Sequence, residues 1–210
     1  NGYAGGSMFK DTITTQYSFS GQVLATLVAH KKGGTGTSQN YKVSTLNIYD
    51  GAGRVTDVFK KVGNSLKTKI SHNDYDELSQ LKQKKLGQQR TSLSDYTYTN
   101  TPIDILKYDY NVRGWLRGIN KDYARNENSA DAWFGMELNY DYGFTESQLN
   151  GNIAGMRWRS KGDGEQRAYG YAYDKSNRLL SGEFNQLTGA DWKHELIDFS
   201  TSNITYDKNG

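Results

Sequence analysis

The stretch YAYDKSNRLLSGEF, residues 171–184, combines an alternation of tyrosines with a turn signal, and it decides how the chain folds. Tyr171 and Tyr173 lie two residues apart, so a strand places both rings on one face. The carboxylate of Asp174 can accept a hydrogen bond from the backbone two residues later, which favours a type I turn. Asn177 then stands where a three-residue hairpin loop requires a left-handed backbone. The stretch therefore predicts a β-hairpin.

The same pattern recurs along the whole chain. Its template is Tyr, Asp or a substitute, two free positions, Gly or a substitute, often Arg, and then an aliphatic residue. Copies begin near residues 17, 49, 75, 110, 149, 173 and 206, so 189 residues contain six intervals with a mean of 31.5 residues. The copy LNGNIAGM at 149–156 is the most worn. The predicted repeat-turn residues are Tyr17, Gly21, Tyr49, Asp50, Gly53, Arg54, Tyr75, Asp76, Tyr110, Gly114, Tyr173, Asp174, Asn177, Arg178, Tyr206 and Asp207.

Each template position has a mechanical role in a strand, turn and strand. The left-handed position is best filled by Gly and next best by Asn. Ser79 occupies it in the third copy, so we expect a distorted turn there. The aliphatic residue that starts each outgoing strand should face the core. The residues expected at the left-handed position are Gly21, Gly53, Gly114, Asn177 and Gly210, and the expected core-facing residues are Val23, Val55, Leu81, Leu116 and Leu179.

Other segments also predict strands. An apolar residue at every second position from Met136 to Phe144 predicts one strand over that range. The turn signal KGDG at 161–164 should join a strand at 156–160 to one at 166–173. The polar, aperiodic stretch 120–132 is interpreted as a surface loop insertion that can contain a single helical turn. The chain is thus expected to be all-β, a single segment of antiparallel hairpin repeats over residues 1–210.

The composition agrees with a β-sheet whose side chains are partly exposed to water. It gives no sign of a nucleic-acid or anionic-membrane partner and rules out thiol chemistry. Hydrophobic residues make up 35% of the chain, below the roughly 45–50% of an average globular protein, while there are 16 Tyr and 23 Gly. Tyrosine can bury its ring and still satisfy its hydroxyl. A net charge of +3 is too small to indicate nucleic acid or an anionic membrane. Without cysteine there are no disulfides and no thiolate chemistry.

No constellation of residues predicts catalysis, a metal site or a cofactor. His30, His72 and His194 fall in different repeats, and no Gly-x-Ser-x-Gly motif is present. The acidic residues at 74–77 are better explained by turns than by calcium binding. The four tryptophans, at 115, 133, 158 and 192, favour cross-strand pairing over a glycan-stacking platform. Arginines at the turn exits, as at Arg54, should lie across neighbouring tyrosines rather than contact a cargo.

Five runs resemble the YD-repeat, or RHS-repeat, proteins of bacteria, in particular the RHS proteins of Bacteroidetes. They are YDGAGRV, YDYNVRGWL, FGMELNYDYG, LNGNIAGMRW and YAYDKSNRLL, and the resemblance spans residues 17–210. The family is related in architecture to the cocoon-forming components of ABC toxins and to the YD shell of teneurins. The resemblance implies a curved ribbon or spiral of hairpins that encloses a chamber. No DPxG-type signature is present, so neither autoproteolysis nor toxin activity is carried over.

The function implied by the resemblance is structural. We expect a non-enzymatic segment of a large exported protein, extracellular or at the cell surface, that encapsulates or displays a C-terminal toxin of the same polypeptide. Its partners are then neighbouring repeats, the enclosed domain, and secretion-system or cell-surface components, without nucleic acid or membrane insertion. The alternative is an adhesion module that binds glycan or protein through exposed aromatics. The half repeat at 206–210 leads us to expect a segment of a longer chain.

Overall fold

The computed structural model describes residues 3–4, 7–32, 39–89, 101–127, 130–144, 147–194 and 198–208. The chain divides into two compact units, residues 1–105 and residues 106–210. In the described part of both units nearly all regular structure is antiparallel strand, accompanied by one short helix. The expected all-β class is therefore confirmed. None of the described residues forms a helix with the length and apolar character needed to cross a bilayer.

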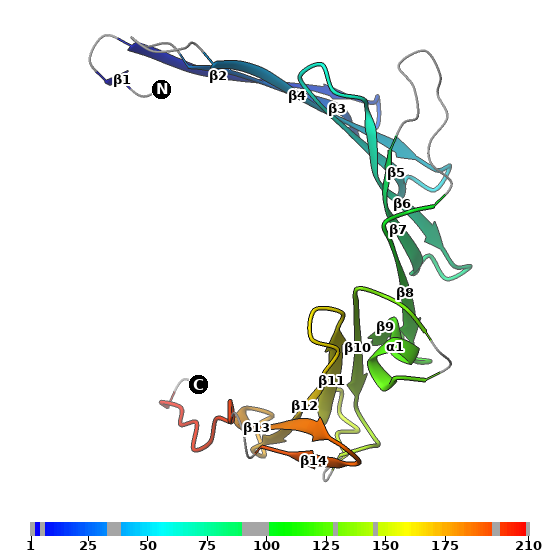
Figure 1. Cartoon of the computed structure of the whole chain (residues 1–210), viewed down its shortest axis with the longest axis vertical. Helices are drawn as coiled ribbons and strands as arrows, with labels where there is room; N and C mark the ends of the chain where they lie inside the picture. Colours follow the sequence, from blue (N-terminus) through cyan, green and yellow to red (C-terminus); the bar gives the residue numbers. More distant parts are fainter. Residues whose placement is uncertain are drawn as a thin grey trace. The chain divides into compact units, whose positions relative to one another are not determined.

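Unit 1 is a meander in which each strand pairs antiparallel with the next one along the chain (Figure 1). Its strands are β1 (Tyr3–Ala4), β2 (Ser7–Tyr17), β3 (Val23–Lys32), β4 (Gln39–Tyr49), β5 (Val55–Val62), β6 (Thr68–Tyr75) and β7 (Leu81–Gln89). Strand β8 (Asp104–Tyr110) begins in this unit and ends in the next.

Unit 2 continues the same strand-after-strand pairing from β8 to β14. Its elements are β9 (Leu116–Ile119), α1 (Lys121–Arg125), β10 (Phe134–Asn139), β11 (Gly155–Ser160), β12 (Gln166–Tyr173), β13 (Leu179–Thr188) and β14 (Asp191–Lys193). The segment after β14 returns to the sheet, where Thr201 bridges Gly182 of β13. The turn KGDG joins β11 to β12, as the sequence predicts.

Unit 1 is a single layer of strands with little buried surface. Apolar side chains stand on both faces, since Val28 pairs with Val43 on one face and Ala25 pairs with Leu46 on the other. Among the described side chains of this unit only Ser71 is buried, and Ile13 is 68% exposed. The predicted core-facing residues, such as Val23 and Val55, are consequently half-buried.

Unit 2 buries side chains on both faces of its sheet. On one face Phe184, 2% exposed, packs against Tyr169, Trp158 and Phe199 at centroid distances of 5.4, 6.2 and 5.3 Å. On the other face α1 lies close to β10, because a Cβ on Gly135 would come within 2.5 Å of a backbone oxygen at the start of the helix. Glycine at that position lets the helix approach the strand.

Two sequence expectations for this unit need correction. Residues 120–132 contain the five-residue helix α1, in agreement with the expected helical turn, but they are not all at the surface, since Tyr123 is 5% and Ala124 0% exposed. The strand expected over 136–144 ends at Asn139, and its deeply buried positions are Gly135, Glu137 and Asn139 rather than the apolar alternate residues. Burial here follows the helix that covers β10, which the alternation of apolar residues does not reveal.

Candidate functional site

Five hairpins end in the same turn, and these turns contain most of the predicted repeat residues. In each of them the first tyrosine of the template pairs with the residue six positions later, after a bulge in the incoming strand. The residue two positions before that partner is left-handed. These residues are Gly21 (φ 84°), Gly53 (φ 81°), Ser79 (φ 64°), Gly114 (φ 77°) and Asn177 (φ 63°). Gly210 lies outside the described residues.

The aspartate of the template holds its turn through both carboxylate oxygens. In the hairpin of residues 171–184, Oδ1 of Asp174 accepts hydrogen bonds from the backbone N–H groups of Ser176, at 2.8 Å, and Arg178, at 2.9 Å. Its Oδ2 accepts from Nε of Arg178 at 2.7 Å. The backbone and side-chain bonds from Arg178 lower the pKa of Asp174. Asp50 and Arg54 repeat these contacts.

Substitutions in the template keep this geometry. Oδ1 of Asn111 accepts from the backbone of Arg113 and of Trp115, both at 2.9 Å, as an aspartate would. Ser79 does not distort its turn, contrary to expectation, since Ser79 N–H donates to the carbonyl of Asp76 at 3.0 Å as in the other copies. Its hydroxyl accepts a hydrogen bond from Nη1 of Arg54 in the preceding hairpin at 2.9 Å. That contact helps to hold a residue that is neither Gly nor Asn in the left-handed region.

The tyrosines connect each hairpin to the one before it. Their hydroxyl groups donate to backbone carbonyls at the start of the preceding outgoing strand, or for Ile153 just before it, which satisfies a polar group at the edge of the turn. Asn47 and Asn73 add a second donor to two of these carbonyls. The five bonds run from Tyr49 to Val23, Tyr75 to Val55, Tyr140 to Leu116, Tyr173 to Ile153 and Tyr206 to Leu179, at 2.7–2.9 Å. We call them the tyrosine ladder.

A second contact strengthens three steps of the tyrosine ladder, those at Tyr75, Tyr140 and Tyr206. The guanidinium of Arg54 lies 4.6 Å from the ring centre of Tyr75, and that of Arg178 lies 4.8 Å from Tyr206. Each arginine is held by its own aspartate, so it is fixed in place before it meets the ring. Trp115 stands at the arginine position of the fourth copy and packs on Tyr140 at 5.2 Å. The arginines therefore contact neighbouring tyrosines, as the sequence analysis favoured.

Tyr140 is a ladder residue that the sequence analysis missed. The worn copy was assigned to 149–156, but the hydroxyl that bonds back to Leu116 belongs to Tyr140, and the next ladder bond accepts at Ile153. The dipeptide Tyr140-Asp141 was the available signal. In the template, the residue whose carbonyl accepts the next ladder bond lies six positions after the tyrosine. A longer connection separates Tyr140 from Ile153, so this copy does not match the template spacing.

The remaining predicted positions are placed as follows. Tyr17 ends β2 and is 60% exposed, while Tyr110 ends β8. Asp76 repeats the backbone contacts of Asp50 through Oδ1. Tyr206 is 38% exposed and is followed by Asp207 at the end of the described chain.

The histidines lie in strands or loops, and His30 and His72 pair with carboxylates. His72 on β6 stands between Asp57 and Asp74, with Nδ1 2.9 Å from one and Nε2 3.1 Å from the other. These carboxylates lie on opposite sides of the ring, so they do not converge on one point. Across the described stretches no group of three or more His, Cys, Asp and Glu residues has a geometry suited to a metal ion.

A buried ion cluster fixes the covered face of unit 2. The carboxylate of Glu137 is fully buried and accepts hydrogen bonds from Arg125, at 2.8 Å to Nε, and from the hydroxyl of Tyr142, also at 2.8 Å. Nε of Arg157 lies 3.4 Å away from the same carboxylate. Burial alone would raise the pKa of Glu137, but the bonds from Arg125 and Tyr142 outweigh it and lower the pKa.

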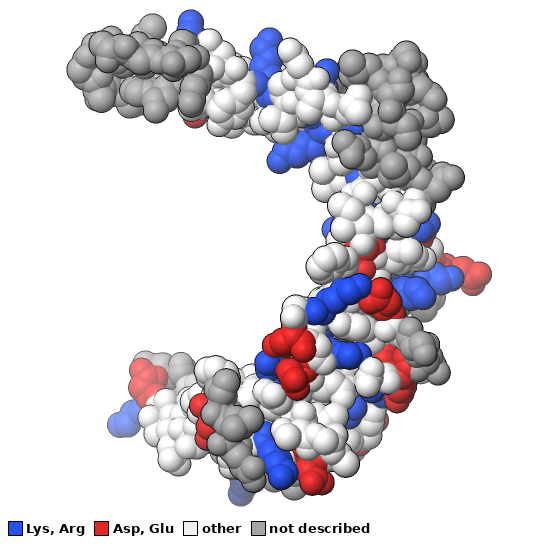
Figure 2. Space-filling model, in the orientation of Figure 1, with Lys and Arg blue, Asp and Glu red and all other residues white. Residues whose placement is uncertain are grey.

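Charges at the surface of unit 2 alternate in sign. Figure 2 shows acidic and basic side chains interspersed over the face of this unit that it presents. Ion pairs account for part of the pattern, for example Arg167 with Asp163 at 2.7 Å and Lys161 with Asp131 at 2.9 Å. The bond from Arg167 lowers the pKa of Asp163 to about 2. Such a mixed surface does not attract one sign of ligand.

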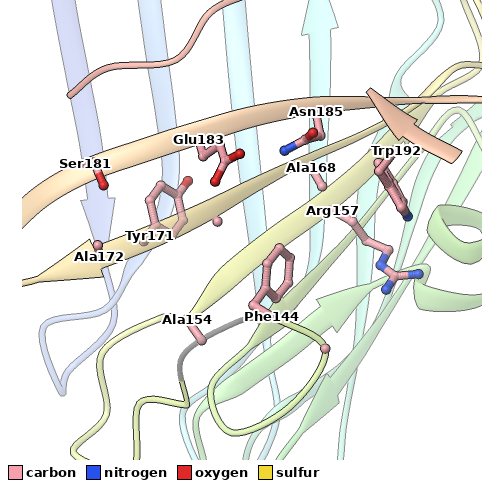
Figure 3. Close-up of a pocket in the computed structure, with 12 residues that line it drawn as sticks. Phe144, Ala154, Arg157, Ala168, Tyr171, Ala172, Ser181, Glu183, Asn185 and Trp192 are labelled. Atoms are coloured by element: carbon pink, nitrogen blue, oxygen red, sulfur yellow. The ribbon is translucent and has the colours of Figure 1, made fainter. Parts of the chain in front are cut away.

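A groove of about 630 Å³ lies over β11, β12 and β13 on the same face as Glu137 (Figure 3). Small residues of β12 form its floor, and Figure 3 shows Arg157 and Trp192 close together at one end. Its lining consists of Gly143, Phe144, Ala154, Arg157, Ala168, Gly170, Tyr171, Ala172, Ser181, Glu183, Asn185 and Trp192. The sequence analysis favoured cross-strand pairing over glycan stacking for Trp192 and did not predict the groove.

Comparisons with known proteins leave the family open. No protein-family model matches the chain, and no curated protein matches it. Among solved structures, a porin-like protein from Bacteroides uniformis is similar over 94% of this chain and 90% of that chain, with 9% sequence identity and a TM-score of 0.31. A likeness at that level carries no argument about fold or function.

Proposed function

We propose that this chain is a non-enzymatic structural segment of a large exported YD-repeat protein. Its hairpins build part of a β shell, a curved or spiral ribbon that encapsulates or displays a C-terminal effector of the same polypeptide outside the cell or at its surface. The observation that carries the proposal is the tyrosine ladder. Because every ladder bond joins one hairpin to the preceding one, the residues that recur in the sequence are those that extend a sheet hairpin by hairpin.

The chemistry of the repeat residues favours a structural role over a catalytic one. Asp50 and Asp174 use their carboxylates to hold turns, and Arg54 and Arg178 are engaged by those carboxylates and by tyrosine rings. A catalytic acid or base needs an oxygen or nitrogen free to reach a substrate. The carboxylates and guanidinium groups of the repeat instead bind one another and the tyrosine rings, within and between hairpins.

The proposal is tested on the natural protein that contains this chain. Its coding sequence and intact mass should reveal further repeats of the same template and a separate C-terminal domain. Limited proteolysis of the intact protein should then leave that domain uncut until the repeats are unfolded. If the C-terminal domain is cut as fast in the intact protein as in isolation, the repeats do not enclose it.

A matched pair of variants makes this experiment specific to the repeats. Gly53→Val places a branched side chain at a left-handed position, whereas Gly51→Val alters the same turn at a position with ordinary φ and open space around Cβ. Protease should reach the enclosed domain sooner in the first variant and at the wild-type rate in the second. Equal protection in both variants would show that the turns do not support the enclosure.

A further inference from the structure

We propose that the groove over β12 binds a neutral oligosaccharide, with one sugar ring stacked on Trp192. This site is independent of the structural role above, since it depends on side chains outside the repeat template. The groove is lined by Arg157, Ser181, Glu183 and Asn185 beside the tryptophan.

The floor of the groove is a track of small residues along one strand, and the ring of Phe144 lies against its middle, 3.4 Å from where a Cβ on Gly170 would stand. Ala168, Gly170 and Ala172 alternate with the tyrosines of β12, so they all lie on the groove side, and none has a side chain larger than a methyl group. At ~3.3 Å per residue the track from the first to the last is roughly 13 Å long. Because Phe144 covers the middle of the track, a sugar ring has room at the Ala168 end, in the row of Arg157 and Asn185.

The polar groups stand in rows across this track. Arg157 pairs with Ala168, which pairs with Asn185, so this arginine and this asparagine flank the floor in one row. Glu183 and Ser181 stand in the next two rows, beside Gly170 and Ala172. Polar side chains therefore line one wall at every second residue of β13, and a cation stands across from that wall.

Several of these polar groups still have bonding capacity. Nε of Arg157 is buried and lies 3.4 Å from the carboxylate of Glu137, while its guanidinium lies 5.9 Å from the ring centre of Trp192 and lines the groove. Glu183 is exposed, and its carboxylate only accepts hydrogen bonds. A guanidinium only donates, and an amide such as that of Asn185 does both.

The ligand must match this set of groups. An anion would face Glu183, a cation would face Arg157, and an apolar molecule would cover the carboxylate of Glu183 without giving it a partner. A neutral saccharide has hydroxyl groups that donate and accept, and an apolar C–H face that can cover an indole. Trp192 is 39% exposed, so part of its ring remains accessible.

Trp133 and Trp115 lack this combination. Trp133 is 57% exposed and also carries a cation near its ring, Lys161 at 5.4 Å, but it does not line the groove. Trp115 is packed between Tyr140 and Gly151, where a Cβ would come within 2.9 Å of the indole. Trp133 therefore provides a matched control for Trp192.

The test is binding of the whole 210-residue chain to an array of cellotetraose, xylotetraose, maltotetraose and chitotetraose, with trigalacturonic acid and an acidic peptide library as charged comparators. Isothermal titration calorimetry then measures Kd for each neutral sugar that binds. We expect at least one neutral oligosaccharide to bind, about tenfold more weakly with Trp192→Ala and unchanged with Trp133→Ala. Glu183→Gln and Asn185→Ala should also weaken binding while the melting temperature stays at the wild-type value.

Three outcomes would overturn the proposal. The first is that none of the neutral sugars binds. The second is that Trp133→Ala weakens binding as much as Trp192→Ala, or that Glu183→Gln and Asn185→Ala leave it unchanged. The third is that trigalacturonic acid or acidic peptides bind more tightly than any neutral sugar, which would assign the groove to an anionic ligand. The structural function proposed above is unaffected by any of them.

Discussion

Replacing Glu137 by glutamine should destabilise unit 2 by about 2–3 kcal/mol. The carboxylate is fully buried, and the substitution leaves Arg125 and Arg157 without their shared counter-ion. Removing one member of a buried ion pair typically costs about 3–5 kcal/mol. The expected loss is smaller because the side chains of Arg125 and Arg157 are 25% and 27% exposed, so water compensates part of their charge.

The same carboxylate should make stability fall in acid. The pKa of Glu137 in the folded protein lies below 4.5, the ordinary value that applies to the unfolded chain. As pH falls below 4.5 the unfolded chain therefore binds this proton first, and the stabilisation present above that pH is lost as pH falls through the folded pKa. Glu137→Gln removes this contribution, so the unfolding free energy of the variant should change less steeply with pH below 4.5 than that of the wild type.

The assay is urea unfolding of the whole chain, followed by tryptophan fluorescence, at neutral pH and at several values below pH 4.5. Glu183→Gln is the matched control, since it removes an exposed carboxylate from β13 in the same unit and should stay within about 0.5 kcal/mol of wild type. If Glu137→Gln matches this control at neutral pH, or keeps the wild-type slope in acid, the cluster does not stabilise the fold as argued.

Three further predictions concern the turns and the tyrosine ladder. Tyr173→Phe should lose about 1 kcal/mol, the worth of one partly buried hydrogen bond, in urea unfolding, whereas Tyr171→Phe, whose hydroxyl makes no bond with the described residues, should stay closer to wild type. Gly53→Val should cost about 1–2 kcal/mol through strain at φ 81°, and Gly51→Val should cost less because its Cβ meets open space. Ser79→Gly should raise the melting temperature slightly in calorimetry, because relief of the left-handed strain exceeds the loss of one exposed hydrogen bond. Equal effects within either pair, or a lower melting temperature for Ser79→Gly, would contradict the turn and ladder assignments.

The hairpins could be predicted from sequence because their signals are local. Asp174 and Asn177 lie three residues apart, and the turn they form depends on contacts within seven residues. The same rule succeeds where Asn111 replaces aspartate, since its Oδ1 accepts the same bonds. The rule is wrong in predicting a distorted turn at Ser79, because the contact that supports this residue comes from Arg54 in the preceding hairpin.

The role of Tyr140, the burial of Glu137 and the groove could not be predicted, because they depend on contacts between residues distant in sequence. Tyr140 bonds to a carbonyl 24 residues earlier, and the alternation of apolar residues beyond Asn139 points to a longer strand than the one that forms. Glu137 looks like a solvent-facing residue in that alternation, yet α1 and its arginine cover it. The groove depends on three strands whose small residues share one face, a property that single strands do not show.

The single layer of unit 1 explains why the repeat uses tyrosine and arginine rather than larger aliphatic residues. A strand that buries little apolar surface gains little from the hydrophobic effect, at about 25 cal/mol per Å². Tyr75 compensates with two contacts to the preceding hairpin, its hydroxyl to the carbonyl of Val55 and its ring to Arg54. Each hairpin is thus stabilised mainly by its neighbour, as in other repeat proteins. A substitution at Tyr75 should therefore loosen two hairpins at once, which hydrogen exchange of the β5 and β6 amides would detect as equal losses of protection.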